Sequence, residues 1–450
     1  MKLLRITILI ISLIGALTFI PATAQTQPVF RIGVLDEPLG RLTKGAVLAA
    51  NEINAAGGVP GADGTLFRLE LVAQPVADMP TAIANLNQAA LIAVIGPESN
   101  QVALDNLSLL QTLNVPVFTP AMVDTLLASD NSGRIFRSRA AEVLRGRALA
   151  NYLVTDLQVR SIATVQMGFD LNVTAGMIGF SEAARALAVA PQPAITIQQE
   201  SETPGAITQI TQANPEIVVL YGDPAQAGSF YTSLRQTGWT GLFAYNDANM
   251  PAFRQEVPLE QLGGLISTTT WPFTASDGAS GAFRTNYVFT FGEVPDAVAA
   301  SAYDVVYLLA NAIGRPGELL TNLLAVDNLR GVQGLLRPAQ LSRGEISNNV
   351  TVVRLNEFGV AQPLARFAGA ERLELDEVIG ATPTPTPTAT PEGVVATVSR
   401  AIQNVRSGPG LSYDVIGQLQ QNEQVQVIGA NLDFSWLVIQ FRGQQGWVSR

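Results

Sequence analysis

Short apolar runs alternate with longer amphipathic runs along residues 30–313, and few folds accept that order. The short runs predict strands at 30–35, 67–73, 91–95, 161–166, 194–198, 216–221, 242–245 and 264–269. The longer runs carry apolar residues at spacings of three and four, which predicts helices at 43–56, 77–90, 142–155, 225–237 and 297–313. Repeated strand–helix units form parallel sheets with helices on both faces. The pattern restarts after Arg137, so we predict an α/β fold with two such sheets.

An alternating Thr–Pro run at 381–391 interrupts this pattern. Pro fixes φ, and the run offers no side chains for a core, so it favours a semi-rigid polyproline II spacer. We therefore place a linker at 376–393, between a large domain at 25–375 and a small one at 394–450. The small domain alternates apolar and polar residues in short runs separated by Gly-containing turns, which predicts a small all-β barrel.

The 450 residues include no His and no Cys. Ser-His-Asp triads, Cys nucleophiles and His/Cys zinc sites each need one of these side chains and are therefore excluded. A hydrolase that uses carboxylates is the remaining enzymatic alternative, but Asp36, Glu37 and Asp304 form no pair with a recognisable catalytic context. The Gly-containing run at 57–64 lacks the Lys-Ser/Thr of a phosphate-binding loop. We expect no enzymatic activity, no metal and no cofactor.

The N-terminus has the pattern of a secretory signal. Lys2 and Arg5 precede an apolar run at 6–20, and small residues follow up to Ala24, so we predict a signal peptide at 1–24. An uncleaved membrane anchor is the alternative, although the run is short for a span of about 20 residues. The formal net charge of −10 argues against nucleic acid as a partner. We expect a secreted protein in the periplasm or on the exterior of the cell envelope.

Five segments of the large domain occur in an order found in a known family. They are 31–35 (Arg-Ile-Gly-Val-Leu) with 44–58 (Lys-Gly-Ala-Val-Leu-Ala-Ala-Asn-Glu-Ile-Asn-Ala-Ala-Gly-Gly), 94–97 (Val-Ile-Gly-Pro), 115–121 (Val-Pro-Val-Phe-Thr-Pro-Ala), 136–138 (Phe-Arg-Ser) and 302–306 (Ala-Tyr-Asp-Val-Val). Together they resemble the type I periplasmic solute-binding proteins of the branched-chain amino acid class. The resemblance implies a ligand enclosed between two lobes that are joined by a hinge of three crossings. Lobe one would comprise 29–137 and 268–337, and lobe two 138–267 and 338–370.

The same resemblance implies ligand contacts from lobe one. Ser99 and Asn100 follow a predicted strand and open a helix, where amides and hydroxyls bind carboxylates; a plain helix cap is the alternative. Thr119, Ala121 and Val123 occupy the next turn after a strand. Relatives tend to carry a hydroxyl at the position of Val123, so its absence weakens carboxylate recognition by this turn. The rim loop at 36–41 is also about ten residues shorter than relatives usually have.

From lobe two, the resemblance points to Phe169, Tyr221 and Asp247. Phe169 would cover an apolar ligand side chain, with core packing as the alternative. Asp247 lies where the family carries an acid for the ligand's ammonium group, with a helix cap as the alternative. Trp271 is a weaker candidate for the cleft.

The segment 404–417 resembles the signature of bacterial SH3-like domains, and 446–448 resembles their closing strand. Such domains often bind cell-wall peptides, so residues 394–450 are a candidate tether to peptidoglycan. Trp436, Trp447 and Tyr413 would form either barrel core or a ligand platform, and core is favoured. Relatives usually add a few residues after the position of Arg450, which leaves open whether the sequence is truncated there.

These observations together predict an extracytoplasmic receptor for a small polar solute, an amino acid or a related amide or peptide. Its expected partners are that small-molecule ligand, an ABC-type permease in the membrane and peptidoglycan, with no nucleic acid, and the protein is expected to be a monomer. A ligand-binding sensory or wall-associated protein without a transporter is the alternative.

Overall fold

The computed structural model describes residues 27–373, 375, 395–407, 415–430, 436–442 and 444–449. The predicted signal peptide at 1–24, the Thr–Pro run and the middle of the SH3-like signature, including Tyr413, lie outside the described residues.

The first sheet has six strands in the order β2-β3-β1-β4-β5-β6. All neighbouring strands are parallel except β2 and β3. The strands are β1 Val29–Leu35, β2 Val59–Pro60, β3 Leu66–Gln74, β4 Leu91–Ile95, β5 Val117–Thr119 and β6 Ile135–Arg137. The helices packed with this sheet are α1 Arg41–Ala55, α2 Met79–Asn87, α3 Asn100–Asp105, α4 Leu107–Gln111, α5 Asp124–Ala128, α13 Ala297–Ile313 and α14 Leu319–Leu324. Helix α12 Gly278–Phe291 packs against α1 and α13. A 3-10 turn at Val76–Asp78 precedes α2, and the hairpin β12 Leu329–Gly331 and β13 Gly334–Leu336 follows α14.

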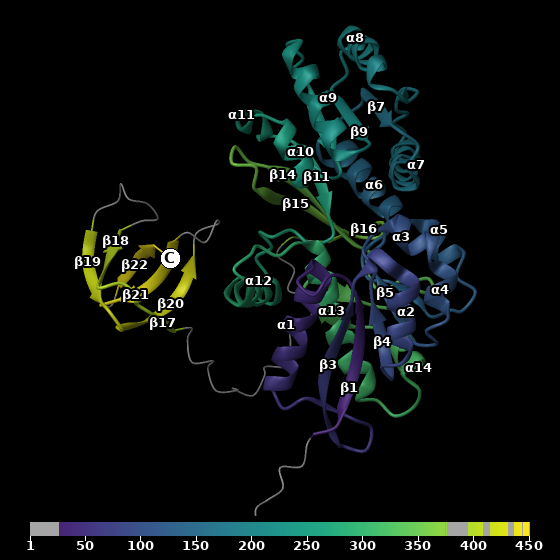
Figure 1. Cartoon of the computed structure of the whole chain (residues 1–450). Coiled ribbons are helices and arrows are strands. Elements are labelled where there is room, and N and C mark those ends of the chain that lie inside the picture. The colour runs from purple at the N-terminus through teal and green to yellow at the C-terminus, as the bar shows by residue number, and fades with distance from the viewer. Residues whose placement is uncertain are drawn as a thin grey trace, which may run out of the picture.

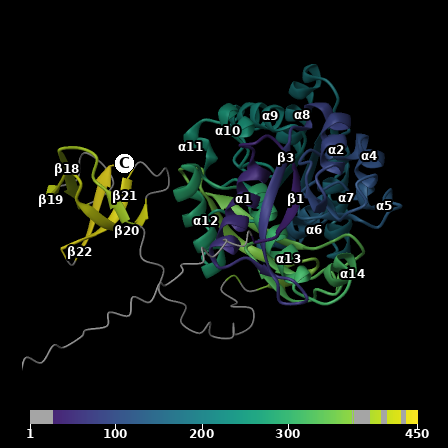
Figure 2. The ribbon, with the colours of Figure 1, turned by 60° about the horizontal axis from the view of Figure 1, so that its bottom comes forward.

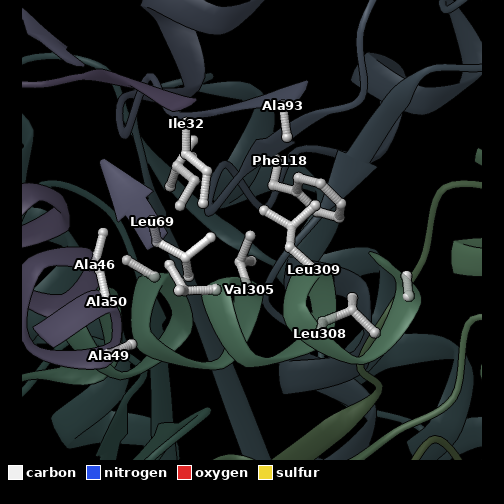
Figure 3. Packing of buried hydrophobic residues seen from close by; sticks show 14 of the residues in the cluster. Ile32, Ala46, Ala49, Ala50, Leu69, Ala93, Phe118, Val305, Leu308 and Leu309 are labelled. Atoms are coloured by element: carbon white, nitrogen blue, oxygen red, sulfur yellow. The ribbon is translucent and has the colours of Figure 1, made fainter. Parts of the chain in front are cut away.

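Helix α13 joins the first sheet although it is far from β1 to β6 in sequence. Its apolar side chains, among them Val305 and Leu309, pack against strand residues such as Ile32 and Phe118 (Figure 3). The views in Figures 1 and 2 agree in placing α1 and α13 beside β1. Burying each such aliphatic side chain contributes about 1.5–3 kcal/mol, so this core fixes the late helix to the early strands.

The second sheet has eight strands in the order β16-β15-β14-β11-β10-β9-β7-β8. Strands β8, β7, β9, β10 and β11 are parallel, and β14 to β16 add an antiparallel edge. The strands are β7 Ile162–Met167, β8 Ile195–Ile197, β9 Ile217–Tyr221, β10 Leu242–Tyr245, β11 Ile266–Thr269, β14 Asn349–Leu355, β15 Ala361–Ala368 and β16 Glu371–Leu373. The helices are α6 Glu142–Asn151, α7 Leu171–Ala186, α8 Thr203–Ala213, α9 Pro224–Gln236, α10 Pro251–Glu256 and α11 Leu259–Leu262, with a π-helical turn at Tyr152–Asp156 and a 3-10 turn at Glu200–Glu202.

The prediction of an α/β fold with parallel sheets is confirmed, and most element bounds differ by only one to three residues. The strand predicted at 264–269 begins at Ile266, because Gly264 has φ +90° and belongs to a turn. The helix predicted at 142–155 ends at Asn151 and continues as the π-helical turn, since Leu157 N–H bonds to the carbonyl of Tyr152.

Helices α6 and α7 approach so closely that only glycine fits at their contact. A Cβ on Gly146 would lie 2.0 Å from the carbonyl oxygen of Gly176, and one on Gly179 would lie 2.2 Å from that of Val143. This contact fixes α6 on the second sheet, and α6 carries two charged residues of the site described below.

The chain passes between the two sheets three times, after β6, after β11 and before β14. Side chains tie these crossings together. Arg137 pairs with Glu345 and also donates to the Met122 carbonyl at 3.0 Å. Arg139 Nε donates to Thr270 Oγ1 at 3.1 Å, which joins the first crossing to the second.

Asp304, one of the acids weighed as catalytic, is buried in α13 and holds the β12–β13 hairpin. Its carboxylate accepts hydrogen bonds from the backbone N–H groups of Val332 (2.7 Å) and Gln333 (3.0 Å) and from the Gln333 side chain (3.2 Å). Burial raises the pKa of Asp304 to about 7, against the effect of these donors. The same Gln333 amide donates to the carbonyl of Ser138 at 3.1 Å, so Asp304 supports the first crossing and has a structural role.

The C-terminal module is an all-β, antiparallel sheet in the order β17-β20-β21-β22-β18-β19, as predicted. Its strands are β17 Val395–Thr397, β18 Ile402–Arg406, β19 Val415–Gln420, β20 Gln424–Ala430, β21 Trp436–Phe441 and β22 Gln444–Ser449. Among the described residues, the buried core consists of aliphatic side chains and Phe441. Trp436 and Trp447 are partly buried, so the choice between barrel core and ligand platform stays a prediction for these two rings.

Candidate ligand-binding cleft

A cleft of about 1130 Å³ lies between the two sheets. The first sheet lines it with residues that follow β4 and β5, and the second sheet with residues that follow β7, β9 and β10. The carboxyl ends of parallel strands are where open α/β sheets bind their ligands. Arg139 and the segment 269–274 line the cleft from the first and second crossings.

A buried ion cluster forms the second-sheet wall of the cleft. Arg145 of α6 donates to Glu142 Oε2 at 2.9 Å and to Asp247 Oδ1 at 2.8 Å. The same guanidinium donates to Thr268 Oγ1 at 3.1 Å and to the carbonyls of Asn246 (2.6 Å) and Thr268 (2.9 Å). Its hydrogen-bonding capacity is therefore used by the protein itself, and its role is to position Asp247.

The two acids of this cluster differ in exposure. The Glu142 side chain is buried and also accepts a hydrogen bond from Asn246 at 2.8 Å, and burial raises the pKa of this carboxyl, with Arg145 opposing the shift. The Asp247 side chain is 41% exposed and lines the cleft. Tyr221 lies nearby with a buried hydroxyl that has no partner among the described residues, and burial raises its pKa well above the usual value. Asp247 is thus a fixed, accessible carboxylate, and the Tyr221 hydroxyl is an unpaired polar group near Glu142 and Arg145.

The first-sheet wall carries a second charged cluster. Arg41, at the start of α1, pairs with both Glu98 and Asp296. Burial raises the pKa of Glu98, while Arg41 opposes that shift. All three residues line the cleft. The two clusters place paired charges on opposite walls.

Four of the eight predicted ligand residues line the cleft: Ser99, Asn100, Tyr221 and Asp247. Ser99 also caps α3, since its Oγ accepts from Val102 N–H at 3.4 Å. Asn100 Oδ1 accepts from Met122 N–H at 2.6 Å, so it also fixes the neighbouring turn. Asp247 pairs with Arg145, and the helix that follows is capped at Met250, so the alternative that the Asp247 side chain caps this helix is not observed.

The other four predicted residues are not among those that line the cleft. Thr119, Ala121 and Val123 are buried, and the Thr119 hydroxyl donates to the Pro97 carbonyl at 2.6 Å. Val123 packs in the apolar cluster beneath α5. Phe169 is 63% exposed, so the alternative of core packing is not observed for it either. The structure therefore does not bring these side chains together with Asp247.

Sequence reasoning missed Arg41, Arg139, Glu142 and Arg145 as cleft residues. A signal for two of them was present, because Glu142 and Arg145 are three residues apart and share a helix face next to Ala148 and Leu149, which are buried. Trp271 lines the cleft, but it is 3% exposed and its Nε1 donates to Ser280 Oγ at 3.2 Å. Within the described ranges, no group of three or more acids could hold a metal ion.

Two helix-covered parallel sheets that share one cleft and are joined by three crossings define a two-lobed solute-binding protein. Residues 35–357 match the family described as periplasmic binding protein, and the chain belongs to this family. Residues 399–450 match the bacterial SH3 domain. This family consists of substrate-binding proteins, which are not enzymes. Membership in the family implies a location outside the cytoplasm. None of the helices in the described part of the chain is long and apolar enough to cross a membrane.

Solved structures share the fold of the large domain. The substrate-binding protein LivJ of a branched-chain amino acid transporter from Streptococcus pneumoniae, in complex with isoleucine, is 22% identical, with a TM-score of 0.60 over 75% of this chain and 99% of LivJ. A solute-binding protein from R. palustris in complex with benzoate is 18% identical, with a TM-score of 0.57 over 78% of this chain and 99% of its own. An amino acid binding protein from Pseudomonas aeruginosa is 24% identical over 210 residues, which are 45% of this chain and 54% of that relative. The chain thus matches about half the length of that curated relative.

Proposed function

We propose that the protein is an extracytoplasmic receptor for a small polar solute, an amino acid or a related amide or peptide, which it delivers to an ABC-type importer. The observation that carries this proposal is Asp247, a carboxylate that Arg145 holds at the cleft wall with its side chain 41% exposed. A fixed acid in a closing cleft binds an ammonium group strongly as water leaves. Structures of similar proteins with isoleucine or benzoate bound support a solute about as large as these two molecules.

The Asp247→Ala variant tests this assignment. We expect its affinity for an amino acid that binds the wild type to fall about 10- to 100-fold, because a hydrogen bond to a charged group contributes about 1.5–3 kcal/mol. Isothermal titration calorimetry against the common amino acids, their amides and short peptides measures the loss. Arg145 retains Glu142 and three further acceptors, so the fold should persist.

Asp327→Asn is the matched control, since Asp327 is an exposed acid that does not line the cleft. Its affinity should equal that of the wild type. Unchanged affinity in the Asp247→Ala protein would show that Asp247 does not contact the ligand.

We also propose that residues 394–450 tether the receptor to peptidoglycan, a role supported by the bacterial SH3 domain match. The full chain should sediment with purified peptidoglycan, whereas a chain that ends at residue 380 should remain in the supernatant. Equal sedimentation of the two chains would show that the module is not the tether.

A further inference from the structure

Arg139 differs from the other arginines that line the inner cleft. It lies on the first crossing, and its Nε bonds to Thr270 Oγ1. Within the described part of the chain, no carboxylate lies within ion-pair distance of Arg139, and its two terminal nitrogens make no hydrogen bond. Arg41 and Arg145, by contrast, are each paired with two acids.

The surroundings of Arg139 compensate its charge only in part, because Asp296, Asp247 and Glu98 act on it from beyond ion-pair distance. The side chain is partly buried, and burial together with the nearby Arg145 lowers the pKa of its guanidinium. The closest acids of both walls are already engaged, Glu98 and Asp296 with Arg41, and Asp247 with Arg145. Two further acids in the cleft, Asp170 and Asp223, cap α7 and α9. An anion placed on Arg139 would supply the partner that the protein itself does not.

The structure also weakens one of the two turns expected to bind a ligand carboxylate, while Ser99 and Asn100 of the other turn still line the cleft. In the turn at 119–123, the side chains of Thr119, Ala121 and Val123 are buried, the Thr119 hydroxyl donates to a backbone carbonyl, and Val123 has no hydroxyl. A guanidinium whose two terminal nitrogens are free can bind a carboxylate through two parallel hydrogen bonds.

We propose that Arg139 is the anchor for the carboxylate of the bound solute, so that the ligand class is an organic carboxylate held at the crossings between the two sheets. This inference rests on the proposed receptor function and specifies its ligand. The carboxylate contacts Arg139, and any amino group of the same solute contacts Asp247 on the second-sheet wall.

A comparison of acids with their carboxamides tests the contact between Arg139 and the ligand carboxylate. The probes are L-leucine, L-isoleucine and benzoate, each paired with its carboxamide, and calorimetry gives Kd for the wild type and for Arg139→Gln. We expect the wild type to prefer an acid over its amide by about 10- to 100-fold, the range of one charge-assisted contact. Arg139→Gln should bind acid and amide equally, and Arg139→Lys should fall between, since Lys keeps the charge but loses the planar fork.

Arg185→Gln is the matched control, because Arg185 is an exposed arginine in the last turn of α7 that does not line the cleft. It should change the Kd of each acid less than about threefold, as expected for a screened charge. Thermal unfolding of the Arg139 variants reports whether they fold.

Three results would overturn the inference. The first is a wild type that binds an amide as tightly as its acid, and the second is an equal loss of acid binding in Arg185→Gln and Arg139→Gln. The third is a wild type that binds no carboxylate but binds a neutral solute from the wider amide and peptide screen, which leaves the receptor proposal intact. A wild type that binds nothing in either screen overturns both proposals.

Discussion

An Arg145→Met variant is expected to lose about 3–5 kcal/mol of unfolding free energy, because removal of one member of a buried ion cluster leaves its partners uncompensated. Glu142 would keep only the Asn246 amide as a partner among the contacts described above, and Asp247 would lose its fixed position. Urea denaturation at pH 8 measures the loss. Ligand binding should weaken in the same variant, because Asp247 is no longer held at the cleft wall.

The loss of unfolding free energy caused by Arg145→Met should be larger at high pH than at low pH. Burial already raises the pKa of Glu142 in the folded protein, and Arg145 is the main group that opposes this shift. Loss of Arg145 raises that pKa further above its value in the unfolded chain. The variant is then most stable at low pH, and its free energy of unfolding falls as pH rises through the pKa of Glu142 in the folded protein. The difference in unfolding free energy between variant and wild type should therefore be smaller at pH 5 than at pH 8.

A double variant separates charge from packing. Glu142→Gln combined with Arg145→Met removes both buried charges, and it should be more stable than Arg145→Met alone at pH 8. If the double variant were the less stable of the two, the loss would come from packing, and the interpretation of the cluster as an ion pair would be incorrect.

A Gly146→Ala variant is expected to lose about 1–3 kcal/mol, although alanine is the better helix former. The added Cβ would lie 2.0 Å from the Gly176 carbonyl oxygen and 2.8 Å from the Phe180 nitrogen. Both are backbone atoms, so α6 and α7 must separate. Because α6 carries Glu142 and Arg145, ligand affinity should fall together with stability.

Gly281→Ala provides the matched control for this effect. Gly281 lies within α12, and a Cβ built there meets no atom within 4 Å. The same substitution should therefore stabilise the protein by up to about 1 kcal/mol. Equal effects of the two substitutions in thermal unfolding would show that the close approach of α6 and α7 does not limit stability.

The fold could be predicted because several of its central strands are buried on both faces. Strand β9 is buried along its whole length, and such strands produce the apolar runs that the sequence displays. Helix α13 was predictable from its periodicity, but its position against β1 depends on packing between segments more than 200 residues apart, which a local pattern does not encode.

The cleft was predicted less completely for the same reason. Asp247 was identified by resemblance, but its partner Arg145 is 102 residues away, and no local spacing relates the two. Thr119 and Val123 were assigned from the pattern of relatives, whereas in this chain Asn100 accepts hydrogen bonds from the turn and the two side chains are buried. Arg139 gave no signal in the sequence, since a single arginine between two elements is ordinary.

The ties among the three crossings limit how the two sheets can move. Arg137 and Glu345 join the first crossing to the approach of the third, and Arg139 with Thr270 joins the first to the second. Sliding of one sheet past the other would break these bonds, whereas rotation about the line that connects them leaves the bonded atoms close together. We therefore expect the two halves of the large domain to open and close by a hinge rotation about this line.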